Sequence, residues 1–67
     1  MDEAKAIATD EWLVICEGAS GTTAEKFAPW WKVNGDKVKA DCGTEGAAQV
    51  HKAYGTYLAR LKAEVTE

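Results

Sequence analysis

The chain has 67 residues, of which 46% are hydrophobic and 28% are charged, and its formal net charge is −3. This composition excludes the disordered class of proteins, and the length leaves room for one small domain, residues 1–67, which buries only about 60% of the surface that its unfolded chain exposes. The overall acidity argues against a general binder of phosphate backbones, because such binders depend on clustered Lys and Arg.

The longest apolar run, residues 12–16, is far too short to cross a bilayer. The first residues are acidic, unlike those of a signal peptide. We therefore expect a soluble cytoplasmic protein without a membrane partner. In that compartment Cys16 and Cys42 are expected to be reduced thiols, whereas an export route would allow one disulfide.

The charges are unevenly distributed along the chain. Residues 1–17 carry five acids and one lysine, for a sum of −4, whereas residues 18–39 carry four lysines and two acids, for a sum of +2. Residues 40–67 sum to −1. The acids of the first segment indicate either a solvated helix face or an acidic surface that docks onto a basic partner.

The first predicted element is a helix over residues 2–17, because alanines dominate its first half and Gly18 stands where a left-handed C-cap is expected. Glu11 projects into the expected apolar face, and Leu13 lies opposite it. An alternative divides the segment into a helix up to Thr9 and a strand over residues 12–16. The residues of the expected apolar face are Ala4, Ile7, Ala8, Trp12 and Ile15.

A loop over residues 18–21 comes next, followed by a short helix. Thr22 and Glu25 have the spacing of a capping box, and Pro29 is expected to end the helix that the box begins. Phe27 is its expected core contact. The segment 18–23 also invites comparison with a phosphate-binding loop, but it contains neither G-x-G-x-x-G nor the Gly-Lys-Thr of a P-loop.

Residues 30–42 predict a β-hairpin, because an Asn-Gly pair lies between two valines. With the turn at residues 35–36 or 34–37, the two halves pair so that apolar residues share one face and Lys32 and Lys39 share the other. The apolar face then consists of Trp31, Val33, Val38 and Ala40.

Trp30 and Trp31 are the sequence's strongest candidates for a structural and a functional role. Adjacent residues on a strand point to opposite faces, so we assign Trp31 to the core and Trp30 to the lysine side. We predict a partner-binding site formed by Trp30, Lys32, Lys37 and Lys39, where the indole anchors a protein or stacks on a nucleobase. The alternative leaves Trp30 covered by the first helix or by the loop at 18–21.

The last predicted element is a helix from Thr44 to about Val65. It carries an apolar stripe and, at Gly55, Ala48 and Ala59, a strip of small residues that another backbone or a ligand could approach closely. A homo-oligomer built along this strip is therefore a further alternative. The expected stripe comprises Ala47, Val50, Tyr54, Tyr57, Leu58, Leu61 and Val65.

No residue set in the sequence has the spacing of a catalytic or metal-binding motif. Cys42 and His51, with Asp41 nearby, could be drawn as a nucleophile and its base, and Cys16, Cys42 and His51 as three zinc ligands. However, the sequence contains no C-x₂-C pair and no H-x₃-H pair. We expect no enzyme activity, no catalytic residue, no metal and no cofactor.

These elements together predict an α+β fold: N-terminal helix, short helix, β-hairpin and long C-terminal helix. A three-helix domain with a loop in place of the hairpin is the alternative. The expected function is a small non-enzymatic protein-binding module, such as an adaptor, inhibitor or assembly factor, that uses the Trp/Lys hairpin face and the acidic first helix. The alternative function is a nucleic-acid-binding regulator that uses Trp30 and the hairpin lysines.

The predicted order of elements also resembles one known family. The helix–hairpin–helix layout is similar to that of the small head–tail joining proteins of tailed phages. The resemblance concerns architecture alone and implies a role in assembly as a further alternative.

Overall fold

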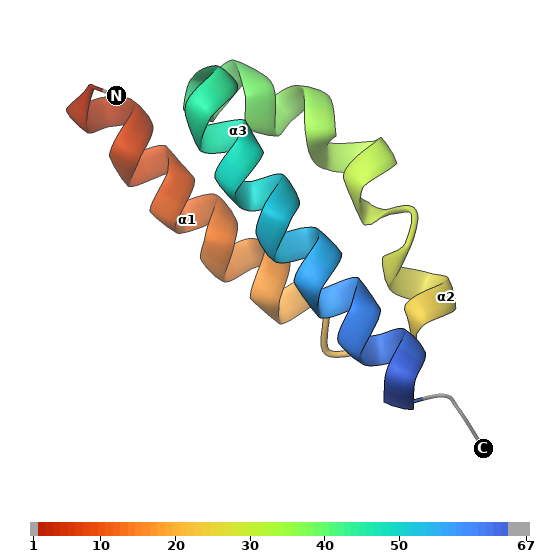
Figure 1. The fold of residues 1–67 in the computed structure, drawn as a ribbon. Coiled ribbons are helices and arrows are strands. Elements are labelled where there is room, and N and C mark those ends of the chain that lie inside the picture. The colour runs from red at the N-terminus through yellow and green to blue at the C-terminus, as the bar shows by residue number, and fades with distance from the viewer. Residues whose placement is uncertain (1, 65–67) are drawn as a thin grey trace.

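In the computed structural model, which describes residues 2–64, the chain forms α1 (Glu3–Ala19), α2 (Ala24–Phe27) and α3 (Trp30–Glu64). Residues 2–64 contain no strand. α3 bends at Gly43, which divides it into a first half, residues 30–42, and a second half, residues 44–64. The first half runs antiparallel to the second, and the second half lies beside α1 and runs in the same direction (Figure 1). The predicted α+β fold is therefore wrong, and the protein is helical. The helix–hairpin–helix layout that carried the resemblance to the phage joining proteins is absent from these residues as well.

The predicted hairpin over residues 30–42 is the first half of α3. The residues that this segment turns inward are Trp31, Gly35, Val38 and Cys42, at intervals of four, three and four residues. That spacing follows the 3.6-residue period of a helix rather than the two-residue period of a strand. Val33, which the hairpin placed on the apolar face, is 70% exposed. The three-helix alternative was also wrong at this segment, where it placed a loop.

Gly35 serves the packing of a helix and not a hairpin turn. A Cβ at this position would lie 3.1 Å from Cε2 of the Trp31 indole, which sits against it one turn earlier. Asn34 uses its side chain within the helix, since Nδ2 donates a hydrogen bond of 3.0 Å to the Trp30 carbonyl oxygen. The Asn-Gly pair is thus accommodated without a turn, because each residue has a helical role.

The long helix α3 is bent sharply at Gly43, which has φ 73° and ψ −179°. This backbone conformation is essentially confined to glycine. The bend falls one residue before Thr44, where the sequence predicts the last helix to start. It folds the two halves of α3 against each other, with the bend near the first turns of α1 (Figure 1).

The buried face of α1 differs from the predicted one. Thr9 and Cys16 are the fully buried residues of this helix, and Ala8, Trp12 and Leu13 pack against the core of α3. Leu13, expected on the opposite side, therefore faces inward. Ile7 and Ile15, expected in the core, are 54% and 48% exposed.

The helix ends also differ in detail from the prediction. The Asp2 carboxylate caps α1 by accepting a hydrogen bond of 2.8 Å from the Lys5 backbone N–H. α1 passes through Gly18 and ends at Ala19, so Gly18 is not a left-handed cap. Thr23, one residue after the predicted Thr22, caps α2 by accepting from the Lys26 backbone N–H at 3.3 Å. α2 ends before Pro29, as predicted.

An aromatic cluster joins α1, α2 and both halves of α3. Phe27 is 1% exposed, which confirms it as a core residue, and its ring lies 6.1 Å from Trp30 and 5.1 Å from Tyr54. Trp12 of α1 meets Trp30 edge to face and donates a hydrogen bond of 2.9 Å from Nε1 to Asp41 Oδ2. The Tyr54 hydroxyl donates to the Ala28 carbonyl oxygen. These contacts fix α2 against the bent helix.

The predicted apolar stripe of the second half of α3 faces the core. Ala47 and Val50 are buried, and Tyr54, Tyr57 and the two leucines of the stripe are partly buried. Val65, the predicted end of this helix, lies outside the described residues. Among residues 2–64, no helix has the combination of length and apolar character that spanning a membrane requires.

Cys16 provides a test of this packing. Its side chain is fully buried, and burial raises the pKa of the thiol to about 11. An unfolded cysteine has a pKa of about 8.5, so the folded protein holds its proton more tightly. Stability is therefore expected to be unaffected below about pH 8.5 and to fall as the pH rises toward 11.

Urea unfolding at pH 7.5, 9 and 10 measures this loss. The Cys16→Ala variant is the control, because it removes the titrating group and should show a smaller decline over the same range. At pH 8, a thiol reagent should label Cys16 of the native protein only at the rate at which the protein opens. Rapid labelling of the native protein would contradict the burial.

Candidate protein-docking surface

The side of α1 that faces away from α3 carries an apolar stripe. Five of its six residues follow alternating intervals of three and four along four turns, and the sixth, Ile15, lies one turn after Glu11, so all six share one face of the helix. The distance from the first to the last is about 21 Å at 1.5 Å per residue. We call this surface the outer stripe; it consists of Ala4, Ile7, Glu11, Val14, Ile15 and Gly18.

All six residues of the outer stripe are exposed, and three are large and apolar. Val14 is 70% exposed, Ile7 54% and Ile15 48%. Val33 of α3 is the remaining large apolar side chain that the structure leaves exposed among the described residues. Three of these four side chains therefore lie on one face of one helix. Isolated exposed hydrophobic residues are ordinary, but several large apolar side chains grouped on one face and bordered by polar residues are typical of an interaction site.

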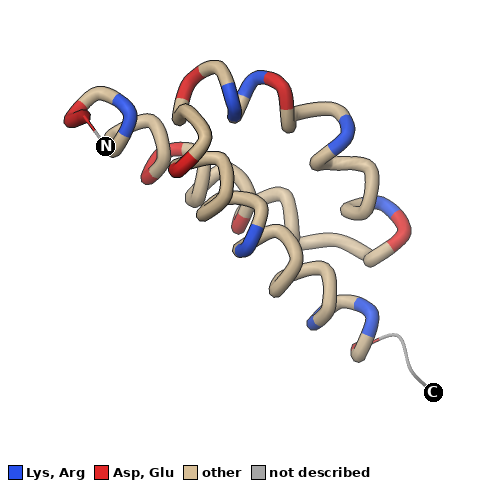
Figure 2. Tube along the Cα trace, turned by 45° about the horizontal axis from the view of Figure 1, so that its top comes forward, with Lys and Arg blue, Asp and Glu red and all other residues tan. Residues whose placement is uncertain are grey.

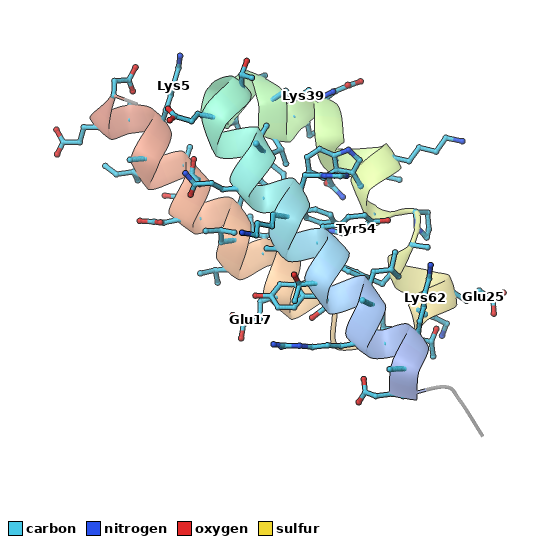
Figure 3. The ribbon with its side chains drawn as sticks, in the orientation of Figure 1. Lys5, Glu17, Glu25, Lys39, Tyr54 and Lys62 are labelled. Atoms are coloured by element: carbon cyan, nitrogen blue, oxygen red, sulfur yellow. The ribbon has the colours of Figure 1, made fainter. Side chains whose placement is uncertain are left out.

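The charges on and beside the outer stripe are all acidic. Glu3, Asp10 and Glu17 flank it on one side, and Glu11 lies at its centre. Lys5, the one basic residue of α1, lies by the bend of α3 instead (Figure 3). Its Cδ is 3.2 Å from the point that a Cβ added to Gly43 would occupy. Figure 2 shows the contrast with the first half of α3, where basic positions are frequent. The surface therefore suits a positively charged partner.

The structure distributes the four predicted site residues over two flanks of α3. Trp30 is partly buried in the aromatic cluster, with its ring stacked on those of Phe27 and Tyr54. Lys32, Lys37 and Lys39 are all exposed. At 100° per residue, Lys32 and Lys39 share one flank of the helix, and Lys37 shares the other flank with Trp30. A partner-binding role for these residues remains a prediction.

Trp30 and Trp31 are both partly buried, unlike the predicted pair that points in opposite directions. Adjacent residues on a helix diverge by about 100°, not 180° as on a strand, so both indoles can reach one core. Their ring centroids are 6.3 Å apart, and each lies 6.1 Å from that of Tyr54.

A groove of about 490 Å³ lies between the two halves of α3 near the bend. Trp31 and His51 contribute to it with ring centroids 4.7 Å apart, and Thr44 lines it next to Gly43. Lys39, labelled in Figure 3, also lines it. Alanines of the second half of α3 complete the lining.

The residues that could be drawn as a catalytic or zinc site occupy different surroundings. Cys16 and Cys42 are buried free thiols, whereas His51 is exposed and its ring lies against Trp31. In the part of the chain that the structure describes, no three His, Cys, Asp or Glu side chains are grouped so that they could hold a metal ion.

The outer stripe was not predicted from the sequence, because Ile7 and Ile15 were assigned to the core and Val14 was assigned to neither the core nor a binding site. A usable signal was present. Residues 12–16 are five consecutive apolar residues, and a single helix cannot turn all of them toward one neighbour. The 4-7-11-14-18 spacing marks the face that remains outside.

No known protein family, no curated protein and no solved structure matches this chain.

Proposed function

We propose that this protein is a small non-enzymatic protein-binding module that docks a helical segment of a basic partner on the outer stripe of α1. The observation that carries the proposal is the grouping of Ile7, Val14 and Ile15, each about half exposed or more, on one face whose charges are all acidic. Helices of two proteins commonly associate through apolar residues at such three- and four-residue intervals.

The partner chemistry follows from the two components of the surface. The apolar side chains supply the gain in free energy on burial, at about 25 cal/mol per Å². The surrounding carboxylates attract a basic partner and repel an acidic one, so they raise the rate of encounter and select among partners. An amphipathic helix with lysines or arginines beside its apolar face satisfies both.

A direct test is the titration of the protein into a fluorescently labelled amphipathic peptide with a leucine stripe and lysine flanks, at physiological salt, with anisotropy as the readout. Val14→Asn is expected to weaken binding about tenfold, because loss of most of a buried valine's transfer free energy amounts to about 1.4 kcal/mol.

The chain offers a matched control. Val33 of α3 is also 70% exposed, so Val33→Asn makes the same change at the same exposure away from the outer stripe. We expect Val33→Asn to bind as wild type does, and a peptide with glutamate flanks not to bind. Equal losses in the two variants, or no binding by the wild type, would contradict the proposal.

The nucleic-acid alternative has less support from the geometry. Trp30, its predicted stacking platform, already packs against the rings of Phe27 and Tyr54. A mobility-shift experiment with single- and double-stranded DNA and RNA at low salt tests it, because any phosphate contact by the lysines of α3 strengthens as salt falls.

A further inference from the structure

We infer that the partner of the outer stripe presents a lysine or arginine opposite Glu11, so that a single charge pair sets the register of the docked helix. The inference rests on the proposed function, because it concerns the occupant of the same surface. It specifies a cationic side chain at one position of the partner, and it excludes a second copy of this chain as the partner.

Glu11 occupies the middle of the outer stripe. Ala4 and Gly18 lie seven residues to either side of it, and Ile7 and Val14 lie one turn before and after it. Its side chain is exposed, and the structure gives it no hydrogen bond or ion pair with any residue from 2 to 64. Its carboxylate is therefore available to a partner and is well hydrated in the free protein.

Docking of a helix along the outer stripe removes water from Glu11. An ionised carboxylate that becomes buried without a counter-charge is strongly unfavourable, whereas a paired one is tolerated. A polar residue at one position of an apolar helix seam is known to specify partner and register at some cost in stability. A cation opposite Glu11 satisfies this requirement, and an apolar residue there does not.

A second copy of the chain fails the same requirement. Because Glu11 is central, a two-fold pairing in which the outer stripes overlap along their whole length, parallel or antiparallel, sets Glu11 of one copy against Glu11 of the other. The flanking acids of both copies add to this repulsion. The apolar side chains would be buried, but two carboxylates would meet without a cation.

The test is a double-mutant cycle with the full chain and two labelled peptides. Both peptides have a leucine stripe and lysine flanks, and they differ at the central stripe position, which is lysine in one and leucine in the other. We expect wild type to prefer the lysine-centred peptide by about tenfold, and Glu11→Leu to prefer the leucine-centred peptide. Glu17→Gln, which changes a flanking acid, is the control and should retain the wild-type preference.

The outcomes separate the inference from the proposed function. If wild type binds both peptides equally, or if Glu11→Leu keeps the preference for lysine, the inference is overturned while the docking surface stands. If wild type binds neither peptide, the proposed function fails. Sedimentation of wild type as a dimer that Val14→Asn dissociates would also overturn the inference, because a second copy would then occupy the stripe.

Discussion

Replacement of Gly46 by alanine is expected to lower the free energy of unfolding by about 3 kcal/mol, a large share of the stability of a domain of this size. A Cβ at this buried position would overlap Oγ1 of Thr9 and Cβ of Cys42. Thr9 is itself 2% exposed, and its Oγ1 donates a hydrogen bond of 2.7 Å to the Lys5 carbonyl oxygen, so it cannot move into open space. Alanine therefore forces α1 and α3 apart. Chemical denaturation followed by Trp fluorescence measures the loss.

The double variant Thr9→Ala/Gly46→Ala tests the stated cause. If the overlap with Oγ1 is responsible, the two substitutions together should cost at least about 1 kcal/mol less than the sum of the single costs. Relief should be partial, because Cβ of Cys42 remains close to the added methyl group. Additive costs would show that the approach of α1 to Gly46 is not the source of the effect.

Gly43→Ala is expected to cost about 2 kcal/mol and to change the state of association. At φ 73° and ψ −179° a side chain is strained, and a Cβ there would also lie 3.2 Å from Cδ of Lys5. Alanine favours ordinary helical geometry at this position, which straightens α3. A straight helix of 35 residues is about 52 Å long and exceeds the 44 Å length of the molecule. The contacts between its two halves could then form only with another chain, as in a domain-swapped dimer.

Denaturation and sedimentation over a range of protein concentrations measure both effects. Gly55→Ala is the matched control, because Gly55 lies in the same helix and a Cβ there would meet no atom within 4 Å. It should raise stability by about 0.5–1 kcal/mol and leave the protein's state of association unchanged. A stable Gly43→Ala variant with the wild-type state of association would show that the bend does not depend on glycine.

The candidate surface was only partly predictable from the sequence. The acidic character of the first helix follows directly from the composition of residues 1–17. The proposed docking role retains the predicted acidic surface for a basic partner. The apolar component was misassigned, because Ile7 and Ile15 were placed in the core. The predicted separation of Trp30 and Trp31 depended on a strand geometry that the chain does not adopt, and both rings lie near Tyr54. The binding role of Trp30 and the lysines remains a prediction.

Local and periodic features were determined by the sequence alone. Pro29 ends α2 because it cannot continue a helix, and Phe27 is buried because a chain this short has few large side chains for its core. The stripe of the second half of α3 is unbroken at the helical period, so its inward face was evident.

The tertiary structure alone decided two matters. In residues 30–42 the Asn-Gly pair between valines favours a hairpin as a local pattern, whereas the packing of Trp31, Val38 and Cys42 in the core selects the helix. The α1 segment carries apolar residues on two opposite faces, so its own pattern does not specify which of them is buried. α1 and α3 can approach closely where Thr9 of α1 meets Gly46 of α3. This contact turns the Thr9 side of α1 inward and leaves the outer stripe exposed.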